Sequence, residues 1–512
     1  MKRFPKSQCS PVYNSSVANE FHFEHSVEFL PENAADVLRG IPALPGVFAL
    51  RGASVEGQAE AQPYLTRAAD LRRRITRLLA PPEFVARAQS SAQGQPTSDG
   101  APVLSKRLNL RGRVAWIEYS VTGSEFESVV TLYCATEAIY GLAEARRRLR
   151  LHTPFFLRFT GENAFPRIYS TNRLSRRALA NYYGPFPSRA AADRYCDAVL
   201  DLFKLRRCSE ELAPYPEHPG CVYQEMNKCL APCNQACTAA GVAAYTAEAA
   251  AVESFLATRG ESLLRTLTAE REQASAEMNF ERAAEIHAQV TRVKAAAMLA
   301  DEIVRPIPRL RSVIVQAAAQ AEDAVATLYL VEGGWLAGPA RLSTLGVRAV
   351  KEQASVGSSL FAQPLILQPV PLAEDSVNSK QPETAARPQG DLSAIFTLNP
   401  EERVVEALNE LATGVERQPR SAQDLARLSD HLSLVRRWYY RPEKQRVGEV
   451  FLPREDDGVS KAEGSWPIRR ILRGAARMTL GDSALGETRL TVEASRESTQ
   501  SADTLPPENP AP

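Results

Sequence analysis

Five of the eight cysteines in this 512-residue chain fall within a single stretch of thirty residues, and this clustering constrains the fold more than any other feature. The stretch also contains Pro214, Pro216, Pro219 and Pro232, so it favours loops over helices and strands. Thiolates are soft ligands that suit zinc and iron–sulfur clusters. The sequence therefore predicts a loop-rich segment wrapped around a metal centre, with buried free thiols as the plainer alternative.

Four of these cysteines would complete a ligand shell, and they are separated by 13, 8 and 4 positions. The predicted ligands are Cys208, Cys221, Cys229 and Cys233. Cys237 is either a spare thiol or a substitute for Cys233. No paired CxxC motifs are present, which weakens the case for a zinc ribbon. Ligand chemistry alone leaves zinc and iron–sulfur both open.

Nothing in the sequence indicates export or insertion into a membrane. No apolar run approaches the roughly 18 residues that a membrane span needs. The N-terminal segment carries charges such as Lys2, Arg3 and Glu20 and has no apolar core. We therefore expect a cytoplasmic protein with no membrane partner. The formal net charge is only +1, so total charge does not by itself identify a nucleic-acid partner.

The order of three motifs resembles that of a known family. The string YYGPFPS at 182–188 precedes LRRCS at 205–209 and PGCVYQEMNKCLAPC at 219–233. This order is similar to the segment between the two named modules of UvrC, the incision subunit of bacterial nucleotide excision repair. In that family four cysteines hold a 4Fe–4S cluster. The resemblance thus implies an iron–sulfur cluster that holds a DNA-binding region together.

A helical hairpin is expected after the cysteines, with helices over roughly 244–277 and 281–300. Asn279 can cap the second helix, and Phe280 provides an apolar anchor. On pattern alone an ordinary surface hairpin would fit equally well. The string EMNFERAAEIHAQV resembles the UVR motif, through which UvrC pairs with the same motif in UvrB. This resemblance implies a UvrB-type helicase partner that contacts Phe280, Ala283 and Ala284.

Residues 41–79 resemble the start of a GIY-YIG nuclease domain, a family that cuts one DNA strand. By this resemblance Tyr64 and Arg74 occupy the positions of a catalytic tyrosine and a phosphate-binding arginine. Phe48 replaces the family's other tyrosine and lacks its hydroxyl. In such a site a divalent metal polarises the phosphate, and a glutamate on a later helix holds the metal.

The position of that glutamate is the main departure from the family. Aligning VTGSEFESVVTL at 121–132 with the family pattern places Leu132 at the metal-binding position. Leucine cannot bind a hard cation, which needs oxygen ligands. We therefore predict a degenerate nuclease site, in which Mg²⁺ binds only if a shift of register brings Glu127 or Glu137 into place.

Basic residues outnumber acidic ones between positions 146 and 207, and aromatic residues are interspersed among them. Such a stretch can neutralise backbone phosphates and stack on exposed bases, although charge runs are usually solvated surface. Together with the family resemblance it predicts DNA binding. The candidate DNA contacts are Arg67, Arg72, Arg146, Arg147, Arg148 and Tyr183. A second patch at 436–444 and 469–473 is a further candidate, whose aromatics would also fit a core with a basic rim.

We expect no counterpart of the second UvrC nuclease centre in the part of this sequence beyond the hairpin. That RNase H-like domain uses two aspartates and a histidine around metal, whereas His431 is the only histidine after position 300 and has no Asp-x-Ser-His string around it. Three strands are expected over 312–345, with Gly333-Gly334 as a hairpin turn. Helices are expected at 401–413 and 422–440.

We therefore expect an α+β multidomain protein with a mixed α/β C-terminal region. Its predicted parts are a flexible arm (1–32), a degenerate GIY-YIG-like domain (33–150) with a polar insertion (83–105), a basic cysteine-cluster region (151–243), a UVR-type helical hairpin (244–300), a small β-rich region (301–370), a linker (371–392), a helical and basic region (393–486) and a disordered tail (487–512).

The function that these features predict is that of a UvrC-like protein of nucleotide excision repair. It would bind DNA and a UvrB-type partner, with impaired or no incision activity. The alternative is an active GIY-YIG endonuclease that makes one incision with a shifted metal ligand. A third possibility is a scaffold whose cluster only staples the fold.

Overall fold

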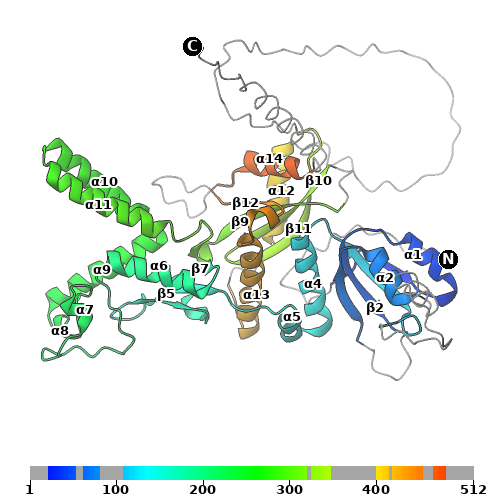
Figure 1. The fold of residues 1–512 in the computed structure, drawn as a ribbon, viewed down its shortest axis with the longest axis horizontal. Helices are drawn as coiled ribbons and strands as arrows, with labels where there is room; N and C mark the ends of the chain where they lie inside the picture. Colours follow the sequence, from blue (N-terminus) through cyan, green and yellow to red (C-terminus); the bar gives the residue numbers. More distant parts are fainter. Residues whose placement is uncertain are drawn as a thin grey trace, which may run out of the picture.

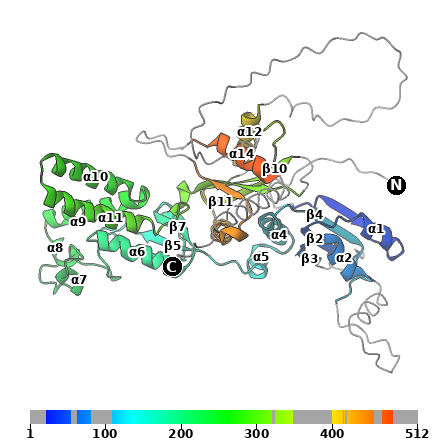
Figure 2. The same ribbon diagram turned by 45° about the horizontal axis from the view of Figure 1, so that its top comes forward.

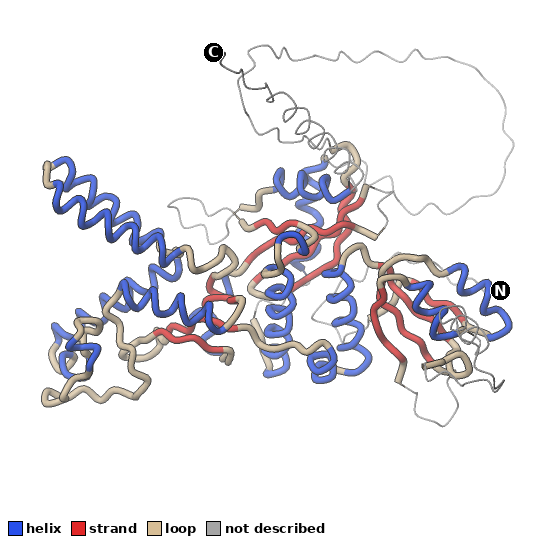
Figure 3. The backbone as a smooth tube through the Cα atoms, viewed as in Figure 1, coloured by secondary structure: helices blue, strands red, loops and turns tan. Residues whose placement is uncertain are grey.

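The computed structural model describes residues 21–53, 62–80, 108–319, 324–347, 399–413, 415, 418–453 and 465–479. Over these residues the chain is a mixed α/β protein built on three antiparallel four-stranded sheets (Figures 1 and 3). The expected mixture of helices and strands is confirmed at this level. Several predicted segments lie wholly or partly outside the described residues, namely 1–20 of the arm, the insertion at 83–105, positions 348–370, the linker at 371–392 and the tail at 487–512.

The first sheet has the strand order β1-β4-β2-β3. Its strands are β1 (His25–Glu28), β2 (Gly46–Arg51), β3 (Tyr64–Ala68) and β4 (Trp116–Val121). Helices α1 (Ala34–Gly40) and α2 (Leu71–Leu79) complete its core, in which Phe48, Leu71, Ile75 and Ile117 are buried. Strand β1 corrects the prediction of a flexible arm over 1–32. It pairs with β4, an interaction between distant positions that local sequence does not reveal.

Helix α4 (Glu125–Tyr140) follows β4 and is separated by Gly141 from α5 (Leu142–Arg148). The two helices are separate because Gly141 has a φ of +82° that only glycine adopts readily. Helix α4 packs on β2 and β3 and also on α13 (Ala422–Tyr439). It therefore joins the first sheet to the C-terminal part of the protein, as Figures 1 and 2 show.

The middle sheet has the order β6-β5-β7-β8 and carries the cysteine segment. Its strands are β5 (Phe155–Phe159), β6 (Ile168–Thr171), β7 (Tyr182–Phe186) and β8 (Arg305–Pro306). Helix α6 (Arg189–Leu202) packs on it, and the helices that follow in the chain are α7 (Val222–Glu225), α8 (Pro232–Gln235), α9 (Ala239–Ala257), α10 (Glu261–Ala276) and α11 (Phe280–Ala297).

The expected helix over 244–277 is wrong, because it is two helices. Gly260, with a φ of +90°, ends α9 and begins α10, and Arg259 before it also has a positive φ of +54°. An arginine-glycine pair at this point is a helix stop signal that the sequence does contain. The hairpin is therefore formed by α10 and α11 alone, and it projects from the body of the protein (Figures 1 and 2).

The C-terminal sheet has the order β11-β10-β9-β12, with helices on both faces. Its strands are β9 (Arg311–Ala317), β10 (Val325–Glu332), β11 (Trp335–Ser343) and β12 (Glu449–Phe451). Val313 and Val315 face a core with α12 (Pro400–Thr413) and α14 (Ile468–Thr479), whereas Ile314 faces the core that contains α13. This alternation is that of a strand buried on both faces.

The three strands and the hairpin turn expected over 312–345 are confirmed, as are the two helices at 401–413 and 422–440. The predicted division into a β-rich region (301–370) and a separate helical region (393–486) does not match the structure. Strand β12 pairs with β9, so the described residues on either side of the predicted linker form one three-layer unit. The short strand at 449–451 gives too weak a local pattern to predict this pairing.

Candidate functional site

Three of the predicted nuclease positions lie together on the first sheet. Phe48 is central in β2, and its ring centroid lies 6.3 Å from that of Tyr64 on β3. The Arg74 guanidinium on α2 donates a hydrogen bond to the Tyr64 hydroxyl at 3.4 Å. The structure therefore brings Tyr64 and Arg74 together, and their assignment to a GIY-YIG-like site stays a prediction. Phe48 is fully buried and places a ring without a hydroxyl beside them.

The glutamate position has no carboxylate. Leu132 lies on α4, where its carbonyl accepts a hydrogen bond from the Thr136 hydroxyl at 2.5 Å. The first of the two alternative acids, Glu127, is only 2% exposed and accepts a hydrogen bond from the Gly123 N–H at 2.7 Å. It also lies 3.6 Å from Arg341 on β11. Burial raises the pKa of Glu127 to about 7.

The second candidate, Glu137, is also engaged elsewhere. Its carboxylate accepts a hydrogen bond from the Arg427 guanidinium of α13 at 2.7 Å, and both side chains are largely buried. Both acids thus join α4 to the C-terminal unit. In the part of the chain that the structure describes, no three His, Cys, Asp or Glu side chains are arranged to hold a metal ion.

The four predicted cysteine ligands are carried by the segment between α6 and α9. Cys221 precedes α7, and Cys233 lies in the short helix α8. The Arg206 guanidinium donates to the Cys208 sulfur at 3.7 Å, and the Ala231 N–H donates to the Cys229 sulfur at 3.3 Å. Such donors to sulfur stabilise the thiolate form, which is the form that binds metal.

The thiols also influence one another. The pKa of Cys229 is raised to about 11, first by burial and then by the charges of Cys208, Cys221 and Cys233. All four sulfurs therefore lie within electrostatic range. Their number and type fit an iron–sulfur cluster or zinc, although these described side chains do not form a closed shell. Cys237 is exposed.

The tip of the hairpin presents apolar side chains to solvent. Met278 in the turn is 76% exposed and Phe280 at the start of α11 is 68% exposed. Asn279 caps α11 as predicted, because its side chain accepts a hydrogen bond from the Arg282 N–H at 3.2 Å. Of the two predicted alanines, Ala284 is exposed, whereas Ala283 packs partly against the core. Sequence reasoning missed Met278, although an apolar residue directly before a capping asparagine was visible.

Three of the predicted DNA contacts are already engaged within the protein. Tyr183 is 4% exposed on β7, so its ring cannot stack on a base, and burial raises its pKa to about 12. Arg146 pairs with the buried Asp430 at 2.9 Å, and Arg72 donates to the carbonyl of Ile41 at 2.6 Å. These three side chains are committed to the fold.

The remaining predicted arginines face solvent. Arg147 and Arg148 both pair with Glu144 on α5, at 2.6 Å each. Arg67 on β3 lies 3.2 Å from Glu125, which Arg441 also contacts at 2.7 Å. The hydrogen bond from Arg441 lowers the pKa of Glu125 to about 2. Arg67, Arg147 and Arg148 are thus accessible, and each lies beside a carboxylate that a phosphate would have to displace. Arg72 is also exposed, although its Nε is held by the Ile41 carbonyl.

Comparison with known proteins matches the middle of the chain to two family models. Residues 155–255 match the middle domain of the UvrC/Cho excinucleases, and residues 261–296 match the UvrB/uvrC motif. The second match coincides with α10 and α11. No solved structure matches the chain.

Curated relatives point the same way. The UvrABC system protein C of Desulforudis audaxviator is 28% identical over 355 residues, which cover 67% of this chain and 51% of that protein. The protein of the same name from Alcanivorax borkumensis is 29% identical over 193 residues, covering 37% of this chain and 30% of that protein. The chain thus spans about half the length, or less, of the curated relatives that it matches.

The fold and these matches define a multidomain α/β protein with the middle domain and the UVR motif of an excinuclease subunit. Residues 155–255 and 261–296 are similar to the corresponding segments of the UvrC family, and the resemblance inferred from the cysteine and hairpin motifs is confirmed. None of the helices in the described ranges is long and apolar enough to cross a membrane.

Proposed function

We propose that this chain is a UvrC-like protein of nucleotide excision repair that binds DNA and a UvrB-type helicase and does not itself cut DNA. The observation that carries this proposal is the hairpin of α10 and α11. It matches the UVR motif and exposes Met278 and Phe280 at its tip. Exposed apolar groups on a projecting element are typical of a protein contact.

The absence of cutting is inferred from the first sheet. A GIY-YIG-like site needs a carboxylate to hold its metal. Leu132 supplies none, and Phe48 removes one hydroxyl. An active nuclease with a shifted ligand would have to withdraw Glu127 from Arg341 or Glu137 from Arg427. Breaking a buried pair leaves an uncompensated charge, at a cost of about 3–5 kcal/mol. We therefore do not adopt the nuclease alternative.

The cysteine segment would hold a 4Fe–4S cluster through Cys208, Cys221, Cys229 and Cys233. The cluster would supply a covalent cross-link between the loops that join α6 to α9. Arg206 and the Ala231 N–H would remain as donors to two of its sulfurs. This role is structural.

Partner binding is the direct test. Purified full-length chain is titrated against a UvrB-type helicase that carries its own UVR motif, and the affinity is measured by calorimetry. Phe280→Ala should weaken binding by tenfold or more, because a central aromatic anchor typically contributes about 2 kcal/mol or more. Met298→Ala is the matched control, since Met298 is 85% exposed at the opposite end of α11. Equal affinity for the Phe280 variant and the original protein would refute the proposed contact.

A further inference from the structure

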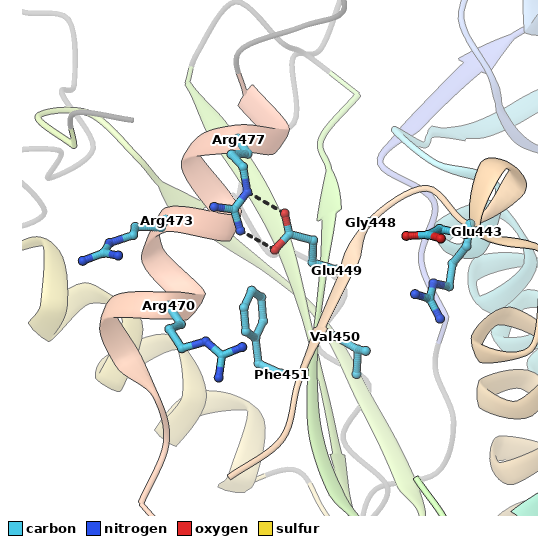
Figure 4. Close-up of a pocket in the computed structure, with 9 residues that line it drawn as sticks. Glu443, Gly448, Glu449, Val450, Phe451, Arg470, Arg473 and Arg477 are labelled. Carbon is cyan, nitrogen blue, oxygen red and sulfur yellow. Dashed lines mark hydrogen bonds and ion pairs between the residues drawn. The ribbon is translucent and has the colours of Figure 1, made fainter. Parts of the chain in front are cut away.

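An arginine-lined cavity lies between α14 and β12, away from the middle domain and the hairpin. Its volume is about 450 Å³. The charged residues that line it are Arg446, Arg470, Arg473, Arg477, Glu443 and Glu449. Four arginines against two glutamates leave two positive charges. Figure 4 shows Arg477 facing Glu449, Arg470 beside Phe451, and Arg473 extending away from β12.

The wall of the cavity depends on the close approach of the α14 and β12 backbones at two glycines. A Cβ on Gly474 of α14 would lie 2.5 Å from the Phe451 ring and 3.0 Å from a carboxylate oxygen of Glu449. Glycine at this position therefore lets the helix approach β12 closely enough for its arginines to share one cavity. Gly448 has a φ of +97°, and a Cβ there would meet Gln316 at 2.1 Å. Glycine is required at both positions for this wall.

Two of the arginines are held in place before any ligand arrives. Arg477 makes two hydrogen bonds with Glu449, at 2.7 and 2.6 Å. Arg446 donates to the carbonyl of Tyr439 at 3.0 Å, and its guanidinium lies 5.9 Å from the Trp438 ring centroid. A guanidinium has five N–H donors, so Arg446 keeps donors for a ligand beyond its bond to Tyr439. Ordering them in advance reduces the entropy lost on binding.

Arg470 completes the arrangement. Its side chain is exposed, and within the described residues it has no carboxylate partner. Its neighbour Arg469 pairs with Glu401 at 2.9 Å and does not line the cavity. These two adjacent arginines of α14 therefore face different surroundings. Arg470 faces the cavity, and Arg469 faces α12.

We propose that this cavity binds a phosphate monoester, carried either by a free nucleotide or by the end of a DNA strand. Arginine forks match phosphate oxygens in a bidentate manner. An excess of two positive charges suits the dianion that a terminal phosphate forms near neutral pH. The volume lies within the range of small-molecule sites, roughly 300–1,000 Å³. This inference does not depend on the proposed repair function, because every residue of the cavity lies outside the segments matched to the family models.

The test uses the full chain and deoxyadenosine monophosphate, titrated by calorimetry at low salt, with deoxyadenosine as the ligand lacking phosphate. The monophosphate should bind and the nucleoside should not. Arg470→Gln should weaken binding about tenfold, since it removes a charged hydrogen-bond donor. Arg469→Gln makes the same charge change outside the cavity and should leave the affinity within twofold.

A lack of monophosphate binding would overturn the proposal, and so would equal losses in the two variants, which would indicate a diffuse surface charge. The source of the phosphate is then resolved with a single-stranded oligonucleotide carrying either a 5′-phosphate or a 5′-hydroxyl. Tighter binding of the phosphorylated strand that requires Arg470 assigns the site to strand ends. Equal binding of the two strands, with monophosphate binding retained, assigns it to a free nucleotide.

Discussion

The first sheet and the middle segment use their chemically distinctive residues in opposite ways. On the first sheet Tyr64 and Arg74 remain hydrogen-bonded, but Leu132 provides no metal ligand. The nearby acids Glu127 and Glu137 face arginines of other elements. In the middle segment the hairpin turns its apolar residues outward, and the sulfurs of the cysteines accept hydrogen bonds.

This difference shows what each region is organised to do. A buried acid that pairs with an arginine fixes two layers against each other, and it is poorly placed to bind a hydrated metal. An exposed Phe280 stabilises nothing within the chain and gains a role only when a partner covers it. We therefore propose that the first region is a structural remnant of a nuclease site and that the second is a binding region.

The largest expected effect concerns the cysteines. Cys229→Ser should abolish incorporation of iron during anaerobic purification and lower the melting temperature strongly, because metal binding of this kind contributes directly to folding. Cys237→Ser should change neither iron content nor melting temperature. Metal analysis with an absorption spectrum checks both. Stoichiometric zinc in the original protein, or equal losses in the two variants, would contradict the cluster assignment.

The next effect concerns the buried pair of Glu137 and Arg427. Arg427→Ala should lower the free energy of unfolding by about 3–5 kcal/mol, because it leaves the Glu137 carboxylate buried without its partner. Urea denaturation measures this loss. A change below about 1 kcal/mol would mean that Glu137 is not needed for packing, and it would reopen a role as a metal ligand.

A third effect is a dependence of stability on pH. Burial raises the pKa of Asp430 to about 7 despite its pairing with Arg146, and Glu137 raises it further. The folded protein therefore binds a proton that the unfolded chain has lost above pH ~4. This contribution to stability is complete at low pH and is lost as the pH rises toward 7.

The Asp430→Asn variant removes this titration. Between pH 5 and 7.5 the original protein should lose on the order of 2 kcal/mol more than the variant. Urea denaturation at several pH values makes the comparison. Parallel curves for the two proteins would show that Asp430 is already ionised in the folded state at pH 5.

The smallest effect is expected for the partly exposed ion pair of Arg441 and Glu125. Arg441→Ala removes one partner of Glu125, but the pair is partly exposed and Arg67 remains nearby. The free energy of unfolding should fall by at most about 1 kcal/mol, and added salt should reduce the difference. If Arg441→Ala lowered the free energy of unfolding as much as Arg427→Ala does, exposed and buried ion pairs would contribute equally to stability, contrary to this prediction.

The sequence predicted what depends on local pattern. The strand-forming stretch at 312–345, with its Gly333-Gly334 turn, predicted the β9–β11 meander, and the cysteine and hairpin strings predicted the family. It did not predict contacts between distant positions. The pairing of β12 with β9, the burial of Tyr183 and the contact of Glu137 with Arg427 all join residues far apart in the chain. Gly141 and Gly260 are helix stop signals that the sequence does contain, and each separates two helices in the structure.

The phosphate cavity illustrates the same limit. Arg470 and Arg477 lie seven positions apart and so fall near one face of a helix, which the sequence could have suggested. Arg446 and Glu449 reach that face only because β12 joins the sheet beside α14. A basic patch was predicted at this point, but its cavity depends on tertiary structure.

The most direct test of the account is a nicking assay on a damaged duplex with a UvrB-type helicase present, in Mg²⁺ and in Mn²⁺. The full chain should join the complex on DNA, as a mobility shift detects, and leave both strands intact. Robust cutting by the original protein that is abolished by Glu127→Gln or Glu137→Gln would contradict the central claim, because it would make one of these buried acids a catalytic metal ligand.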